Sequence, residues 1–111
     1  RARRGKPPVK EIARLSELAV GESLTFHYPT DAETCVLVRM DERRLVAFDQ
    51  ACTHLSCPVI PRVAENRFEC PCHHGSFDLE SGRPTAGPPR RPLQRIRIDL
   101  AGDKVLATGY A

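Results

Sequence analysis

The first half of the chain alternates apolar and polar residues with a period of two, which is typical of β-strands that bury one face. Strands are predicted at residues 9–13, 23–28, 34–40 and 45–48. In the longest of these runs, Cys35 and Leu37 share one face and Val36 lies on the other. A single helical turn is expected at residues 15–21. A short turn at residues 41–43 joins the last two strands into a hairpin.

The alternation stops at residue 49 and returns in full only near the C-terminus. A short strand is predicted at residues 67–69, and longer strands at residues 93–100 and 104–108. In the first of the longer strands, Ile96, Ile98 and Leu100 face inward. The fold class is therefore all-β: an antiparallel β-sandwich framework with an inserted subdomain.

The length of 111 residues is that of one domain. We expect a single domain over residues 1–111, with residues 1–8 as a flexible lead-in and residues 49–92 as the inserted subdomain. Ten Pro and seven Gly fit an all-β chain with many turns.

The net charge is a mild +3, with basic residues grouped at the N-terminus and at residues 90–97. These groups are either solvated surface or a docking site for an acidic partner or lipid headgroups. No basic stripe is interleaved with aromatic residues, so we expect no nucleic-acid partner. No apolar run has the length of a bilayer span, so membrane attachment is expected only through a segment not present in this chain.

Four of the five Cys and three of the four His fall in two short segments. The first segment reads Cys52-Thr53-His54-Leu55-Ser56-Cys57, and the second reads Cys70-Pro71-Cys72-His73-His74-Gly75-Ser76-Phe77. Together they give C-x-H, fifteen residues, then C-x-x-H. Such clustering indicates a metal centre. A structural zinc site is one interpretation, but it needs four ligands and leaves the second Cys of each segment without a role.

These two segments resemble the Rieske iron–sulfur family, and in particular its cytochrome bc branch. That branch carries C-T-H-L-G-C, which the first segment matches at all but one position, and the second segment matches C-P-C-H. The run Gly87-Pro88-Pro89 resembles the proline loop that covers the cluster in that branch. The resemblance extends over roughly residues 37–108.

The resemblance implies one [2Fe–2S] cluster with Cys52 and Cys70 on one iron and His54 and His73 on the other. Cys57 and Cys72 stand at matching places in the two segments, and the resemblance implies a disulfide between them. A disulfide indicates an oxidising compartment such as the periplasm. Leu55, beside a ligand, matches the apolar residue that lines the contact surface for a partner.

Ligation by both thiolates and imidazoles changes the charge of the cluster and its coupling to protons. Two thiolates in place of four make the cluster less negative, so it accepts an electron more readily and its potential rises. The imidazoles of His54 and His73 keep an N–H whose acidity depends on the charge of the iron, so uptake of an electron and of a proton can be coupled.

The second segment departs from the bc branch after His73. Aligned without a gap, the Ser that donates to a bridging sulfide is replaced by Gly75, and the Tyr that donates to a ligand thiolate is replaced by Phe77. Loss of one such donor, at about 1.4 kcal/mol, lowers a one-electron potential by about 59 mV. An insertion at His74 would instead leave the donor role to Ser76. The ungapped ending resembles small Rieske ferredoxins, which lack the disulfide.

We therefore expect a one-electron carrier, as the iron–sulfur subunit of a membrane quinol-oxidising complex of cytochrome bc type. Its partners would be a quinol or other electron donor and a cytochrome or other redox acceptor. The alternative is a Rieske carrier of another system, either a ferredoxin-like shuttle or an arsenite-oxidase-like small subunit. No residue is assigned a catalytic role. We expect the chain on the periplasmic or outer face of a bacterial membrane.

Overall fold

The computed structural model describes residues 7–54, 56–72 and 74–111. The strands of this part of the chain are β1 Lys10–Arg14, β2 Ser23–His27, β3 Thr34–Arg39, β4 Leu45–Asp49, β5 Ile60–Arg62, β6 Arg67–Cys70, β7 Gly75–Asp78, β8 Pro84–Ala86, β9 Ile96–Ala101 and β10 Lys104–Tyr110. Two short 3₁₀ helices follow β1 and β5, at Leu15–Glu17 and Val63–Glu65.

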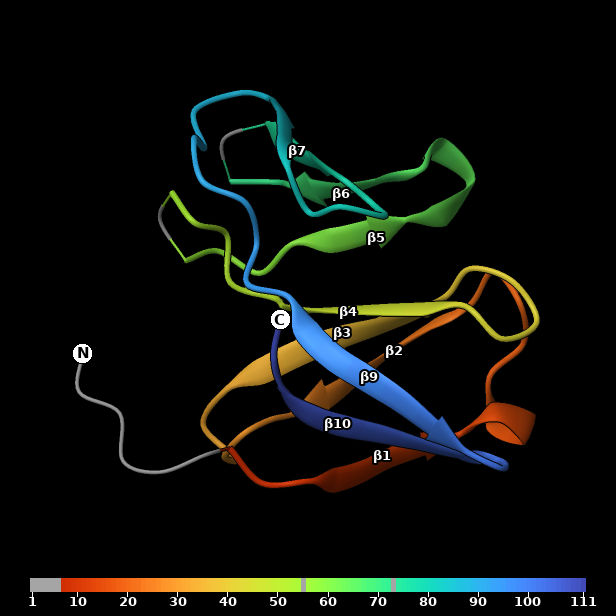
Figure 1. Ribbon diagram of the computed structural model, residues 1–111. Helices are drawn as coiled ribbons and strands as arrows, with labels where there is room; N and C mark the ends of the chain where they lie inside the picture. The colour runs from red at the N-terminus through yellow and green to blue at the C-terminus, as the bar shows by residue number, and fades with distance from the viewer. Residues whose placement is uncertain (1–6, 55, 73) are drawn as a thin grey trace.

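The strands form three antiparallel sheets within the described residues. Their orders are β1-β10-β9, β2-β3-β4 and β5-β6-β7-β8. The first two sheets, here called the framework, pack against each other, and the third lies on the outer side of β2-β3-β4 (Figure 1). The chain leaves the framework after β4 and returns to it at β9, so the third sheet is an excursion between two neighbouring framework strands.

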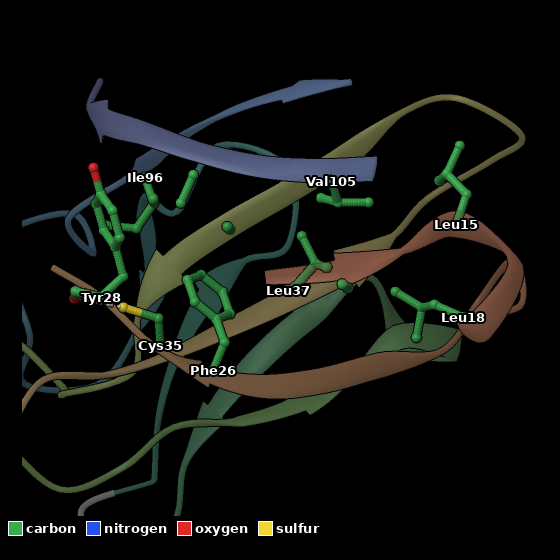
Figure 2. Packing of buried hydrophobic residues seen from close by; sticks show 11 residues of the cluster. Leu15, Leu18, Phe26, Tyr28, Cys35, Leu37, Ile96 and Val105 are labelled. Atoms are coloured by element: carbon green, nitrogen blue, oxygen red, sulfur yellow. Dashed lines mark hydrogen bonds between the residues drawn. The ribbon is translucent and has the colours of Figure 1, made fainter. Parts of the chain in front are cut away.

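Strand β3 faces two hydrophobic cores because both of its faces are covered. Cys35 and Leu37 belong to the core between the two framework sheets, together with Phe26 and Val105 (Figure 2). Val36 and Val38 belong to a second core, together with Phe48, Phe68 and Phe77. A strand with only one buried face would show polar residues at alternate positions, whereas β3 is apolar from Cys35 to Val38.

The four-stranded sheet is held on the framework by contacts around Phe48. Its ring meets that of Phe68 edge to face, with centroids 5.5 Å apart. A Cβ at Gly82 would lie 2.6 Å from the Phe48 ring, so the β7–β8 turn approaches as closely as only glycine allows. The guanidinium of Arg95 lies 5.0 Å from the centroid of the Phe48 ring. The all-β prediction is confirmed.

The framework strands begin and end within three residues of their predicted bounds, but three strands of the third sheet, β5, β7 and β8, were missed. β5 and β8 have three residues each, and both contain a proline. Such short runs carry no measurable alternation. Ile96 faces inward as predicted, whereas Ile98 and Leu100 are only partly buried.

Candidate cluster-binding site

The first loop, residues 50–58, begins where β4 ends and is closed by hydrogen bonds across its base. The Cys52 amide donates to the Cys57 carbonyl at 2.8 Å, and the Ser56 amide donates to the Cys52 carbonyl at 2.8 Å. Ser56 has a φ of 62°, which lets the chain reverse within five residues. This closure buries Cys52, at 2 % exposure, and leaves His54 exposed.

The second loop joins β6 to β7. Cys70 and Gly75 are paired at its base, so residues 71–74 form a four-residue connection. Cys70 is fully buried, while His74 is exposed with a φ of 58°. The His74 side chain therefore faces solvent.

A disulfide joins the two loops. Cys57 of the first loop and Cys72 of the second are bonded, with their Cα atoms 6.4 Å apart. Cys52 and Cys70 lie outside any disulfide at the bases of the same loops, and both belong to the second core. The predicted Cys57–Cys72 bridge is therefore confirmed, and it brings the two thiol-bearing segments together.

The proline segment, residues 87–92, packs on the second loop almost backbone to backbone. A Cβ at Gly87 would lie 2.6 Å from the Cα of Gly75, and the φ of Gly87 is +85°. A Cβ at Gly75 would lie 2.9 Å from Cδ of Pro89. Pro88 is exposed, whereas Pro89 is buried. The contact with Gly75 is therefore made by Pro89, which the sequence analysis did not single out from the Gly-Pro-Pro run.

The strand pairing decides which side chains share the face of Cys70. Directly paired residues of antiparallel strands project to the same face, so Gly75 lies on the Cys70 face and Ser76, paired with Glu69, lies on the other. The Ser76 hydroxyl is 2.7 Å from Oγ1 of Thr85 in β8. Phe77 is fully buried in the second core. The Cys70 face thus presents no hydroxyl from Gly75 or Phe77.

A further tie joins the first loop to the proline segment. The Thr53 hydroxyl donates to the Arg91 carbonyl at 2.7 Å, and Nη2 of Arg91 donates to the Thr53 carbonyl at 3.3 Å. Thr53 lies between Cys52 and His54. Sequence reasoning missed this pair, because nothing local relates two residues 38 positions apart.

The thiol of Cys35 lies apart from the two loops and has different surroundings. Cys35 lies in the framework core, and its thiol donates to the Tyr28 carbonyl at 3.3 Å. Burial raises the pKa of Cys35 to about 12. A thiol of that pKa stays protonated at neutral pH and is a poor nucleophile. Cys35 is thus a buried free thiol of the framework core.

Below the second loop, Glu69 accepts a hydrogen bond from Arg62 at 2.9 Å, which holds the pKa of the Glu69 carboxyl below its usual range. The carboxylate therefore stays charged and paired on the outer face of β6, away from Cys70.

The described residues fit the donor set of a [2Fe–2S] cluster. Two unbridged thiols lie buried at the bases of two loops, the loops are covalently tied, and His54 stands exposed two residues after Cys52. Buried cysteines and an outward imidazole suit a cluster with one iron inside and one at the surface. The predicted site residues Leu55 and His73 lie outside the described residues.

Comparison with known proteins decides the family. The model of the Rieske [2Fe-2S] domain matches residues 9–97. This chain belongs to the Rieske [2Fe–2S] family. Its cofactor is one [2Fe–2S] cluster, and its function is electron transfer through that cluster.

Three proteins show which kinds of Rieske protein this chain is similar to. Carotenoid phi-ring synthase of Chlorobaculum tepidum is 40% identical over 101 residues, which cover 91% of the chain and 15% of the synthase. The cytochrome b6-f complex iron-sulfur subunit of Chlorobaculum thiosulfatiphilum is 32% identical over 90% of the chain and 58% of the subunit. The ferredoxin of carbazole 1,9a-dioxygenase from Nocardioides aromaticivorans IC177 superimposes with a TM-score of 0.75 at 26% identity, covering 91% of the chain and 97% of the ferredoxin.

The Rieske chain thus spans less than two thirds of both curated relatives. Within the residues that the structure describes, no helix has the length and apolar character of a bilayer span. Related Rieske proteins work with redox partner proteins, as a subunit of a cytochrome b6-f complex or as the ferredoxin of a dioxygenase.

Proposed function

We propose that this chain is the cluster-bearing part of a membrane quinol-oxidising complex of cytochrome bc type, on the periplasmic or outer face of a bacterial membrane. The observation that carries the proposal is the Cys57–Cys72 bridge between the loops. A disulfide persists in an oxidising compartment, which is where such a complex exposes its iron–sulfur domain. The similarity to a cytochrome b6-f iron-sulfur subunit points the same way.

The ligands in this proposal are Cys52 and Cys70 on the inner iron and His54 and His73 on the outer iron. The cluster supplies a one-electron couple when bound. The two cysteines hold it from the buried side, and the closed base of each loop orients them. The exposed His54 imidazole offers the outer route for electron and proton, with Leu55 beside it as part of the surface that a quinol or cytochrome approaches.

The second part of the proposal is a potential below that of ubiquinol-oxidising members. Gly75 lies on the Cys70 face without a hydroxyl, and Ser76 is engaged with Thr85 on the other face. Donors to a cluster favour its reduced, more negative state. Their absence suits a low-potential donor such as menaquinol.

Chemical analysis of the purified protein is the first test. We expect iron and acid-labile sulfide in equal amounts, about two of each per chain. A colourless, zinc-loaded, iron-free sample would refute the cluster and favour a structural zinc site.

Protein-film voltammetry as a function of pH tests the proposed reduction potential. We expect a potential lower than that of ubiquinol-oxidising members, falling further as rising pH removes protons from the ligand imidazoles. G75S and G75A form a matched pair, because both side chains displace Pro89 but only Ser adds a hydroxyl. A higher potential in G75S than in G75A supports the proposed donor position. A wild-type potential as high as that of ubiquinol-oxidising members contradicts it.

A second candidate is a Rieske carrier of another redox system. The similarity to carotenoid phi-ring synthase and to a dioxygenase ferredoxin favours it. Purification of the native protein from detergent-solubilised membranes separates the two candidates. Co-purification with b-type haem, read from reduced-minus-oxidised spectra, supports the quinol-oxidising complex. A haem-free preparation supports the second candidate.

A further inference from the structure

A hollow beside the first loop carries positive charge without a carboxylate side chain. It is lined by Thr53, Ser81, Arg91, Leu93, Gln94 and Arg95, among others. We propose that this basic hollow is where an acidic surface of a protein redox partner docks, with a partner carboxylate seated between Arg91 and Arg95. The inference rests on the electron-transfer function proposed above and adds the chemistry of the partner.

One wall of the basic hollow is the first loop itself. Thr53 lines the hollow and exchanges two hydrogen bonds with Arg91. Thr53 stands between Cys52 and His54, two of the proposed ligands. A partner seated in the basic hollow therefore touches the segment that holds the cluster, and the electron has a short path to it.

The arginines of the basic hollow pair with no carboxylate side chain among the described residues, while the main chain of Ala111 also lines the hollow. Ion pairs with carboxylates are made by Arg14, Arg44, Arg62 and Arg67. Neither Arg91 nor Arg95 makes one with any residue that the structure describes; Arg95 donates to the Glu80 carbonyl and stacks on Phe48. Residues 50–64 and 84–98 contain no Asp or Glu. Uncompensated charge of one sign steers a partner of the opposite sign.

A second hollow, which shares no lining residue with the basic hollow, carries the opposite charge. It is lined by Glu33, Asp49 and Ser56, among others. A partner that is acidic where it meets Arg91 and basic or neutral near Glu33 binds in one orientation. An anionic bilayer presents charge of one sign only and does not match the acidic second hollow, so a protein partner fits the arrangement better than lipid headgroups.

The rate at which the reduced holoprotein is oxidised tests whether the positive charge of Arg91 attracts an anionic partner. The probe is hexacyanoferrate(III), which takes one electron from the reduced cluster and becomes hexacyanoferrate(II). At low ionic strength R91Q should slow this reaction about threefold, and R91K should restore it. With the cation tris(phenanthroline)cobalt(III), R91Q should instead speed the reaction. Both effects should vanish near 1 M salt, where the Debye length is about 3 Å.

Two substitutions serve as controls. R43Q removes an equal charge from the exposed β3–β4 turn, on the far side of the molecule from the proline segment (Figure 1), and should leave both rates unchanged. E33Q removes a negative charge from the second hollow and should slightly speed oxidation by hexacyanoferrate(III). Equal effects of R91Q and R43Q would overturn the proposal.

Competition on the unsubstituted protein identifies the class of partner and does not depend on whether R91Q folds. Poly-L-glutamate should slow oxidation by hexacyanoferrate(III), whereas vesicles of phosphatidylcholine and phosphatidylglycerol should not. Slowing by the vesicles alone would assign the basic hollow to lipid and overturn the protein partner. Iron and sulfide are counted first, so a sample without a cluster refutes the electron-transfer function rather than the basic hollow.

Discussion

The framework and the four-stranded sheet each bury completely a cysteine that forms no disulfide, yet the two side chains differ in surroundings. Cys35 lies mid-strand in a core built from framework strands, with Tyr28 as its hydrogen-bond partner. Cys70 ends a strand at the base of a loop that is tied to another loop by a disulfide. Burial alone does not distinguish a packing thiol from a candidate ligand, whereas position at a loop base does.

The two regions also fix their geometry differently. The framework relies on apolar packing along strands of five to seven residues. The four-stranded sheet has strands of three or four residues. Its loops are set instead by the disulfide, by the contact of Gly87 with Gly75, and by positive φ at Ser56 and His74. Substitutions of these special features should affect the cluster more than the framework.

The largest expected effect separates the two thiols directly. C70S should abolish the cluster, because the inner iron loses a proposed ligand, while C35A should retain it. Iron and acid-labile sulfide analysis, with the EPR spectrum of the reduced protein, checks both. Full sulfide content in C70S, or its loss in a folded C35A protein, would contradict the assignment.

Removing the disulfide should have the next largest effect. The bridge spans 15 residues, and in the chain-entropy model such a loop stabilises by about 3 kcal/mol. The free energy of unfolding, measured by urea denaturation, should fall by that amount in C57A/C72A. Each single substitution should cost about as much as the double, because either one breaks the bridge. Additive single effects would show that the two cysteines stabilise independently.

Adding a methyl group between the proline segment and the second loop should lower the stability by a smaller amount. G87A places a Cβ 2.6 Å from the Cα of Gly75 at a φ of +85°, so it should cost about 2 kcal/mol and make the cluster less resistant to loss. G102A is the matched control, since Gly102 has a φ of +62° and open space around it. It should cost only about 1 kcal/mol. Equal losses of stability in G87A and G102A would mean that the proline segment and the second loop can move apart without cost.

The smallest effect concerns the framework thiol at alkaline pH. The folded pKa of Cys35 is about 12 against 9.0 for a free thiol, so above pH 9 the unfolded chain releases a proton that the folded chain retains. Stability should therefore fall by about 1 kcal/mol between pH 9 and pH 10. C35A should remove this part of the decline. An unchanged slope in C35A would show that other groups cause it.

Sequence reasoning predicted the framework and the site to different degrees. Alternation along β2 and β9 needs only local information, so both strands were predicted. The Cys and His spacing indicated the loops and the Cys57–Cys72 bridge for the same reason. The contacts of Pro89 with Gly75 and of Arg91 with Thr53 could not be predicted, because each joins residues distant in the sequence through tertiary packing.

The two covered faces of β3 have a consequence for how the protein opens. Val36 and Val38 are shared with the four-stranded sheet, while Cys35 and Leu37 are shared with the other framework sheet. Detaching the four-stranded sheet would strip one side of this strand and expose its apolar residues to water. Amide protons of β3 and β6 should therefore exchange with solvent as a single cooperative unit, and the protein should lose its cluster and its fold together.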